Sequence, residues 1–266
     1  MQFAGSHILS ISQFERADVE RLFTVADAMR PYAHRERITR VLDGAILGSM
    51  FFEPSTRTRI SFGSAFNLLG GEVRETTGFE HSAIAKGESL YDTARVLSGY
   101  SDIIVMRHPE DGSVSEFAAA SRVPVINGGD GANEHPSQAL LDLYTIRSEL
   151  AGRQRALDGL RVAMVGDLRF GRTVHSLSKL LSLFEGLRIS LVSPEALSMP
   201  EAVVETLREA GHEVLETDVL ETGIADVDMV YSTRIQEERF ASPEGADLFS
   251  GRDPLTQGIY TANCEP

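Results

Sequence analysis

Residues 45–59 read AILGSMFFEPSTRTR, and this stretch decides the fold. Its first part, Ala45–Phe52, is an apolar run of the length typical of a buried strand. A polar turn follows, after which Phe62, Phe66 and Leu69 recur at helical spacing. A buried strand that leads through a polar turn into an amphipathic helix is typical of an α/β protein with a parallel sheet.

The same alternation of strands and helices continues along the chain. A first helix is expected after a capping box at Ser12–Glu15. Further helices are expected at about 88–99, 136–150, 172–184 and 200–210, and strands at 103–106, 123–126, 161–165, 187–192, 213–216 and 228–232. A polar segment at 151–159 separates two alternating series. We therefore expect two domains, 1–150 and 151–266, each a mainly parallel sheet flanked by helices.

Composition limits the classes of function. The 266 residues include 25 basic and 39 acidic side chains, and the resulting net charge of -14 disfavours binding to nucleic acid or to an anionic membrane. No apolar run approaches the roughly 18 residues that a membrane span needs, and the N-terminus does not resemble a secretory signal. The single cysteine, Cys264, excludes an intrachain disulfide and fits a reducing cytoplasm.

The turn after the first strand carries the clearest chemical signal. Ser55, Thr56, Arg57 and Thr58 bring hydroxyl groups and a guanidinium to a helix start, where backbone N–H groups are also free. Arginine suits phosphate because its planar fork donates two hydrogen bonds at once. A Ser-Thr-Arg triplet alone is equally well explained as a helix cap, but the longer string is more specific.

Further motifs follow in order along the chain. They are VMRHP at 105–109, NGGDG at 127–131, HPSQALLD at 135–142, VGDLRFGRTVHS at 165–176 and STRIQ at 232–236. With the string at 51–59, these motifs resemble the aspartate/ornithine carbamoyltransferase family from about residue 8 to about residue 240. The resemblance implies the carbamoyltransferase fold.

The resemblance also implies a role for each matching residue. The phosphate of carbamoyl phosphate would be held by Ser55, Thr56, Arg57 and Thr58. The carbamoyl group would be surrounded by Arg107, His135 and Gln138. The acceptor's carboxylates would be clamped by Arg172, Arg234 and Gln236. A loop from the neighbouring subunit of a homotrimer would contribute Ser82 and Lys86. The catalytic residues implied are Arg57, Arg107, His135 and Lys86, while regulatory or dihydroorotase chains stay open as further partners.

Each of these residues also has an ordinary structural interpretation. His135 precedes a helix-starting proline and could simply cap that helix. Lys86 could be a solvated lysine, and Arg234 could form surface ion pairs. Arg172 is different, because a cation at a helix N-terminus is unfavourable unless an anion joins it.

The sequence predicts neither a metal nor a cofactor. The histidines are not at zinc-ligand spacing with Cys264. The loop Gly166–Gly171 follows a strand, but its spacing matches neither the Walker motif nor Gly-x-Gly-x-x-Gly.

Two arginines, Arg172 and Arg234, favour a dicarboxylic acceptor over ornithine, whose side-chain amine a second guanidinium would repel. The implied reaction transfers the carbamoyl group of carbamoyl phosphate to L-aspartate, giving N-carbamoyl-L-aspartate and phosphate in pyrimidine synthesis. Fixed donors would stabilise the tetrahedral oxyanion. The departing phosphate would take the amine's proton, so that no protein base is needed.

The resemblance fades after about Ser250. The family's closing His-Pro-Leu-Pro-Arg loop and its terminal helix find no counterpart, so the chain is expected to be C-terminally short. This opens an alternative function, namely a catalytically impaired homologue that acts as an anion-binding or assembly subunit.

Overall fold

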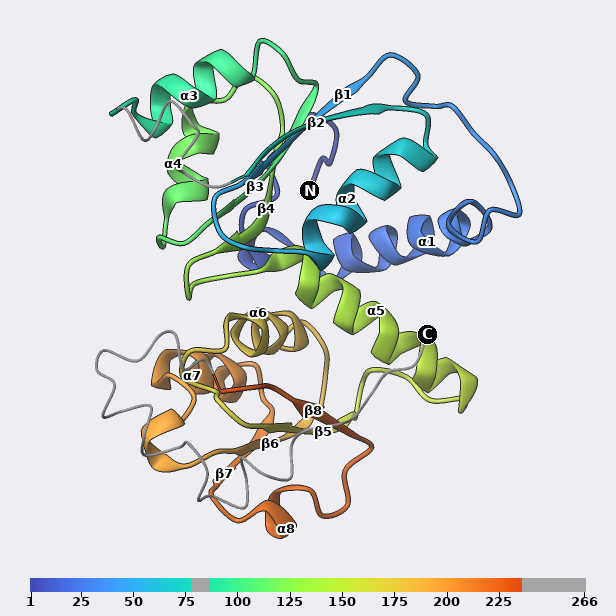
Figure 1. Ribbon diagram of the computed structural model, residues 1–266. Coiled ribbons are helices and arrows are strands. Elements are labelled where there is room, and N and C mark those ends of the chain that lie inside the picture. Colours follow the sequence, from blue (N-terminus) through green and yellow to red (C-terminus); the bar gives the residue numbers. More distant parts are fainter. Residues whose placement is uncertain (78–86, 236–266) are drawn as a thin grey trace. The chain divides into compact units, whose positions relative to one another are not determined.

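The computed structural model describes residues 1–77 and 87–235 (Figure 1). Contacts between residues divide the chain into two compact units, Met1–Gln138 and Ala139–Pro266. Across the described ranges, no helix combines the length and the apolar character that a membrane crossing requires. Each unit is built around a four-stranded parallel sheet with helices packed on it, which confirms the expected α/β class.

The first unit contains a sheet in the order β2-β1-β3-β4. Its strands are β1 (Ile46–Phe51), β2 (Glu72–Thr77), β3 (Ile103–His108) and β4 (Val125–Asp130). Its helices are η1 (Ile11–Gln13), α1 (Arg16–Ala33), α2 (Arg57–Leu68), α3 (Leu90–Leu97) and α4 (Ser113–Ala120). The chain runs from β1 to β2 on one side and then returns to β3 on the other side of β1. The connection therefore reverses direction between β1 and β3, where ligands of such sheets usually bind.

Alternating side chains of the central strands build two apolar layers in this unit. One layer joins Met50 and Met106 to Phe117 of α4, and the other joins Phe51 and Val105 to Phe66 of α2. Figure 1 shows α3 and α4 on one face of the sheet and α2 on the other. Because both faces are covered, the carboxyl-terminal edge of the sheet is left to display polar residues.

The second unit contains a sheet in the order β7-β6-β5-β8. Its strands are β5 (Arg161–Val165), β6 (Arg188–Val192), β7 (Glu213–Thr217) and β8 (Met229–Ser232). Its helices are α6 (Arg172–Leu181), η3 (Glu195–Leu197), α7 (Glu201–Glu209) and α8 (Leu220–Gly223), and α5 (Pro136–Gly152) enters it from the first unit. Here the direction of connection reverses between β5 and β8.

The strand β5 faces a different helix on each side. The Ser178 hydroxyl of α6 donates to the Met164 sulfur at 3.4 Å, so Met164 points toward α6. Ala163 and Val165 point the other way and pack with Leu220 of α8. This alternation fixes the register of β5 and therefore the direction in which the loop after it leaves the sheet.

The structure corrects the start of the first helix. The predicted capping box at Ser12–Glu15 is wrong, because Ser12 lies inside η1, whose capping box is formed by Ser10 and Gln13. The helix α1 begins after Glu15, whose N–H donates to Asp18 at 3.0 Å. Ser10 and Asp18 each accept hydrogen bonds from nearby backbone N–H groups, so two helical segments, η1 and α1, form where one helix start was expected.

Candidate active site

The turn between β1 and α2 presents a helix N-terminus beyond the sheet. Thr56 is the N-cap of α2, and its side chain makes no capping hydrogen bond. Ser55 and Thr58 are half-buried, whereas Arg57 is exposed. The first N–H groups of α2 are therefore not capped by Thr56. The hydroxyl groups of Ser55 and Thr58 and the guanidinium of Arg57 belong to the same end of the helix. This is the chemistry of an anion site.

Arg107 lies near the carboxyl end of β3 and pairs with an acidic residue of the turn between β1 and α2. Its Nε donates to Glu53 Oε2 at 3.1 Å, and the two side chains are only 13% and 24% exposed. The main chains are joined as well, since the Phe52 N–H donates to the Arg107 carbonyl at 2.9 Å. An ion pair of this kind holds a guanidinium in one orientation, because few other partners are available to it at low exposure.

His135 is buried in a short connection between β4 and α5, with 4% of its surface exposed. The Ser137 hydroxyl lies 3.3 Å from His135 Nδ1, and the Gln138 N–H donates to the His135 carbonyl at 3.1 Å. The preceding Glu134 is anchored from the N-terminal segment, because its carboxylate accepts from the Ser10 hydroxyl at 2.9 Å and from the Ile11 N–H at 2.8 Å. The position of His135 is thus fixed on both sides.

These three positions lie at one edge of the first sheet. Arg57 follows β1, Arg107 is the penultimate residue of β3 and His135 follows β4, and these strands are consecutive neighbours. Parallel strands place their carboxyl ends at the same edge of the sheet. The three residues therefore lie at one edge, at the ends of β1, β3 and the next strand, β4.

The second unit repeats the arrangement at β5 and β8. The loop after β5 can approach the end of β8 only because Gly166 has φ +120°, and a Cβ there would lie 2.2 Å from the Thr233 carbonyl oxygen. The Thr233 N–H in turn donates to the Val165 carbonyl at 2.9 Å. The fully buried Asp167 closes the turn by accepting from the N–H groups of Arg169 and Phe170.

Arg172 follows the loop after β5, and Arg234 follows β8, so the two residues come from the two segments that approach each other here. Arg172 is the first residue of α6 and is 8% exposed, whereas Arg234 lies two residues beyond β8 and is exposed. Since β5 and β8 are neighbours, both residues lie at the edge where the connection reverses. An anion at this edge would offset the unfavourable helix dipole at Arg172.

Three predicted site residues, Ser82, Lys86 and Gln236, lie outside the described residues. Three further residues had no role predicted from the sequence. Glu53 pairs with Arg107, and Asp142 and Tyr231 are hydrogen-bonded to each other. Two of these residues could have been noticed from the sequence. Glu53 is a carboxylate inside a basic turn, and Asp142 follows Gln138 by four residues, which puts both on one side of α5.

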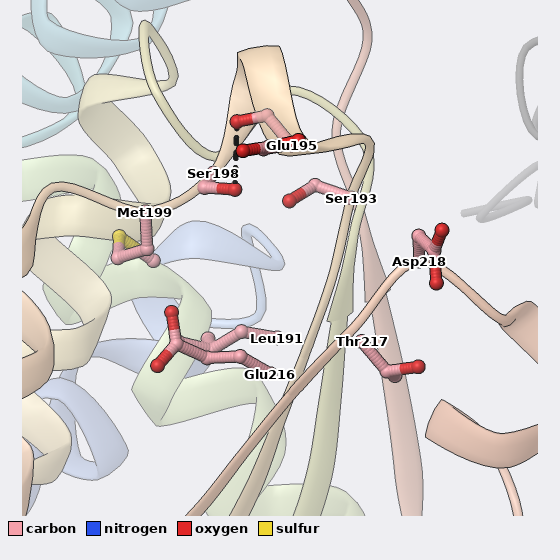
Figure 2. Close-up of a pocket in the computed structure, with 8 residues that line it drawn as sticks. All are labelled: Leu191, Ser193, Glu195, Ser198, Met199, Glu216, Thr217 and Asp218. Carbon is pink, nitrogen blue, oxygen red and sulfur yellow. Dashed lines mark hydrogen bonds between the residues drawn. The ribbon is translucent and has the colours of Figure 1, made fainter.

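The second unit also has a hollow of about 200 Å³ at the ends of β6 and β7 (Figure 2). It is lined by Leu191, Ser193, Glu195, Ser198, Met199, Glu216, Thr217 and Asp218. Three of these side chains are carboxylates, which would repel an anionic substrate. Within residues 1–77 and 87–235, no group of three histidine, cysteine or acidic side chains is placed to hold a metal ion.

Two family models match the chain and together cover most of it. The carbamoyl-phosphate-binding domain of aspartate/ornithine carbamoyltransferases matches residues 6–148, and the aspartate/ornithine-binding domain matches residues 158–248. The chain belongs to the aspartate/ornithine carbamoyltransferase family, as the motifs predicted.

Similar proteins are named more narrowly. The aspartate carbamoyltransferase catalytic subunits of Saccharophagus degradans and Cellvibrio japonicus are 72% and 69% identical over the whole chain, which spans 79% of each. The catalytic subunit of M. jannaschii aspartate transcarbamoylase superposes with a TM-score of 0.83 at 42% identity, over 96% of this chain and 80% of that one. The Trypanosoma cruzi aspartate transcarbamoylase, in complex with carbamoyl phosphate and aspartate, gives a TM-score of 0.84 at 42% identity, over 92% and 76%.

Proposed function

We propose that this chain transfers the carbamoyl group of carbamoyl phosphate to the amine of L-aspartate, which gives N-carbamoyl-L-aspartate and phosphate. The observation that carries the proposal is the 72% identity, over the whole chain, to an aspartate carbamoyltransferase catalytic subunit. The site supports it physically, because cationic and hydroxyl groups gather at two sheet edges of a protein whose net charge is -14. Such local charge suits two small anionic substrates.

In the first unit, the phosphate of carbamoyl phosphate is assigned to the start of α2. The groups proposed to hold it are the hydroxyls of Ser55, Thr56 and Thr58, the guanidinium of Arg57 and the first amides of α2. Arg57 also offsets the charge that grows on the phosphate oxygen as the C–O bond breaks. A donor aimed at developing charge is worth about 10²–10³ in rate.

The carbonyl oxygen of the carbamoyl group is assigned to Arg107 and His135, with Gln138 beside them. The aspartate amine forms a C–N bond at the carbamoyl carbon, and the carbonyl oxygen becomes negative in the tetrahedral intermediate. Arg107 is oriented by Glu53, and His135 is fixed by the turns around it, so both donors are in place before the charge develops. The departing phosphate accepts the amine's proton.

The acceptor is assigned to the second unit. The carboxylates of L-aspartate are proposed to meet Arg172 and Arg234 at the edge between β5 and β8, together with Gln236. Ser82 and Lys86 are proposed to reach this site from a neighbouring subunit of a homotrimer. On this proposal, residues 1–150 bind carbamoyl phosphate and residues 151–266 bind aspartate, in the cytoplasm and as a step of pyrimidine synthesis.

A colorimetric assay for carbamoyl-aspartate tests the proposed activity. Purified protein with carbamoyl phosphate and L-aspartate should form the product at a rate that saturates in both substrates. L-ornithine in place of aspartate should give no comparable turnover, because a second guanidinium repels its side-chain amine. Preference for ornithine would overturn the assignment of the acceptor.

The same preparation tests the anion-binding or assembly alternative. Binding of carbamoyl phosphate by calorimetry, without any turnover, would support that alternative over the enzyme. N-(phosphonacetyl)-L-aspartic acid, which is bound in a T. cruzi aspartate transcarbamoylase structure, is a suitable probe because it joins both substrate-like halves. The proposed enzyme should bind it more tightly than phosphate or aspartate alone.

A further inference from the structure

A buried phenol connects three elements of the second unit. The Tyr231 hydroxyl donates to Asp142 Oδ2 at 2.8 Å, and the side chain of Thr173 hydrogen-bonds the same phenol oxygen. Tyr231 lies on β8, Thr173 on α6 and Asp142 on α5. Burial, and to a lesser degree the Asp142 carboxylate, raise the pKa of Tyr231, so the hydroxyl keeps its proton and its role as donor at neutral pH.

This network lies next to both arginines that are assigned to the acceptor. Thr173 directly follows Arg172 in the first turn of α6, and Tyr231 precedes Arg234 by three residues. Tyr231 is the register partner of Met164, which points toward α6. The phenol therefore stands on the α6 side of the sheet, between the start of that helix and the end of β8.

Two cationic residues at one sheet edge bind a dicarboxylate well only when their spacing matches that of the two carboxylates. Backbone contacts at Gly166 and Thr233 bring the two segments together, and a Cβ at Gly171, the N-cap of α6, would lie 3.6 Å from Thr233 Oγ1. The Thr173–Tyr231–Asp142 hydrogen bonds join these two elements directly through side chains. Small displacements of binding groups reduce the affinity for a rigid, doubly charged ligand strongly.

We propose that Tyr231 and Asp142 are positioning residues that set the spacing of Arg172 and Arg234 for a dicarboxylic acceptor. The inference rests on the proposed function and deepens it, because it names what keeps the acceptor site selective. Neither residue touches the substrate on this proposal. Their loss should therefore weaken the binding of aspartate while leaving the carbamoyl phosphate site in the other unit unchanged.

The variant Tyr231→Phe tests the proposal, because it removes the hydroxyl and keeps the ring. We expect the KM for aspartate to rise by about tenfold or more, and the KM for carbamoyl phosphate to change by less than about twofold. Asp142→Asn keeps an oxygen that can accept from Tyr231, so its KM for aspartate should lie closer to wild type than that of Asp142→Ala. Tyr144→Phe, which removes a phenol hydroxyl from α5 in the same unit, is the matched control and should behave as wild type.

A merely structural role gives a different pattern. In that case Tyr231→Phe would lower the melting temperature and change both KM values alike, or neither, and either pattern overturns the proposal. If wild type shows no turnover, the same variants are compared by calorimetric titration with succinate, a dicarboxylate without an amine. Loss of succinate affinity in Tyr231→Phe then supports the inference while the proposed reaction fails. Equal affinity in wild type and variant, or no binding to wild type, overturns the inference.

Discussion

At the scale of single residues, the Glu53–Arg107 ion pair explains how a cation can be buried at the end of a strand and still be ready for a ligand. Glu53 takes one N–H of the guanidinium at 3.1 Å and lies two residues beyond β1. An arginine whose stem and Nε are fixed in this way loses little further freedom when an anion arrives. The sequence indicated an anion site here, but the pairing depends on β1 and β3 being neighbours, which only the fold shows.

Arg57 is the residue whose removal should affect the chemistry most directly. Arg57→Ala should lower turnover by about 10²–10³, because a contact to the charge that develops on the leaving phosphate is lost. The measurement is the initial rate of carbamoyl-aspartate formation at saturating substrates.

Arg59 supplies the control for that substitution. It lies two residues further along α2 and pairs with Glu75 at 2.9 Å. Arg59→Ala removes an equal charge from the same helix and should leave turnover within a few-fold of wild type, since exposed ion pairs contribute only about 0–1 kcal/mol. Equal losses in the two variants would contradict a specific role for Arg57.

At the scale of elements, every strand except β2 was predicted, including the polar edge strand β7. The runs that became β1, β3, β5 and β6 are covered on both faces, so burial leaves a clear mark in their sequences. The strand β2 (EVRETT) was not predicted, because it is an edge strand that pairs only with β1 and needs no apolar run. The helix α4 was also missed, because its 8 residues are too few to show a clear helical repeat, although Val114 and Phe117 are in the core.

The placement of the site residues on these elements was predictable in part. A turn that follows a buried strand must lie at the carboxyl edge of a parallel sheet, and this rule places Arg57 and Arg172 at the starts of their helices. Arg107 was expected just after a strand at 103–106 and instead lies inside β3. Partners that come from distant segments could not be predicted in the same way. The contact of Asp142 with Tyr231 joins residues 89 positions apart, and no local pattern encodes it.

The close approach at Gly166 makes a prediction for the loop after β5. Gly166→Ala should both destabilise the protein and raise the KM for aspartate, because its Cβ would collide with the Thr233 carbonyl and displace Arg234. Gly159→Ala is the matched control, since Gly159 also has a positive φ (+73°) but has nothing within 4 Å of an added Cβ. It should cost about 1–2 kcal/mol in urea unfolding from backbone strain alone and leave the KM unchanged. Wild-type KM in Gly166→Ala would contradict the steric argument.

A second element-scale prediction concerns the segment before β8. Asp228, 5% exposed at its side chain, accepts from Arg161 at 2.7 Å and also pairs with Arg155. These hydrogen bonds, led by the one from Arg161, lower the pKa of Asp228 below its usual value. Asp228→Asn should therefore destabilise the protein at pH 7 by about 1–3 kcal/mol, measured by urea unfolding.

The pH dependence of that destabilisation has a definite sign. A lowered pKa in the folded state means that the stabilising effect of Asp228 is fully present above the unfolded value of about 3.9 and is lost as the pH falls below it. The gap between wild type and Asp228→Asn should therefore narrow below about pH 4. Asp226→Asn removes an exposed carboxylate that also pairs with Arg161, and its effect should be small. A gap that stays constant down to pH 2 would contradict the ion-pair explanation.

At the scale of the whole molecule, the proposed homotrimer can be tested by mixing two inactive proteins. Arg57→Ala and Lys86→Ala should each be nearly inactive, but a mixed trimer contains some sites with an intact Arg57 and an intact Lys86 from the neighbour. Random assembly of equal amounts should restore roughly a quarter of the wild-type rate, because each of the two requirements is met half the time. The assay is run before and after dissociation and reassociation of the mixture. No recovery, in samples where mass spectrometry detects mixed trimers, would contradict sharing of sites between subunits.

The anchoring of Glu134 by Ser10 and Ile11 has a practical consequence for work with this protein. The main chain at Ile8 also pairs with Ile126 of β4. The first dozen residues thus hold the segment that carries His135 in place, although more than a hundred residues separate the two segments along the chain. Removing or altering this N-terminal segment should therefore loosen His135, and kinetic constants measured on such a preparation would not describe the native protein if His135 acts as proposed.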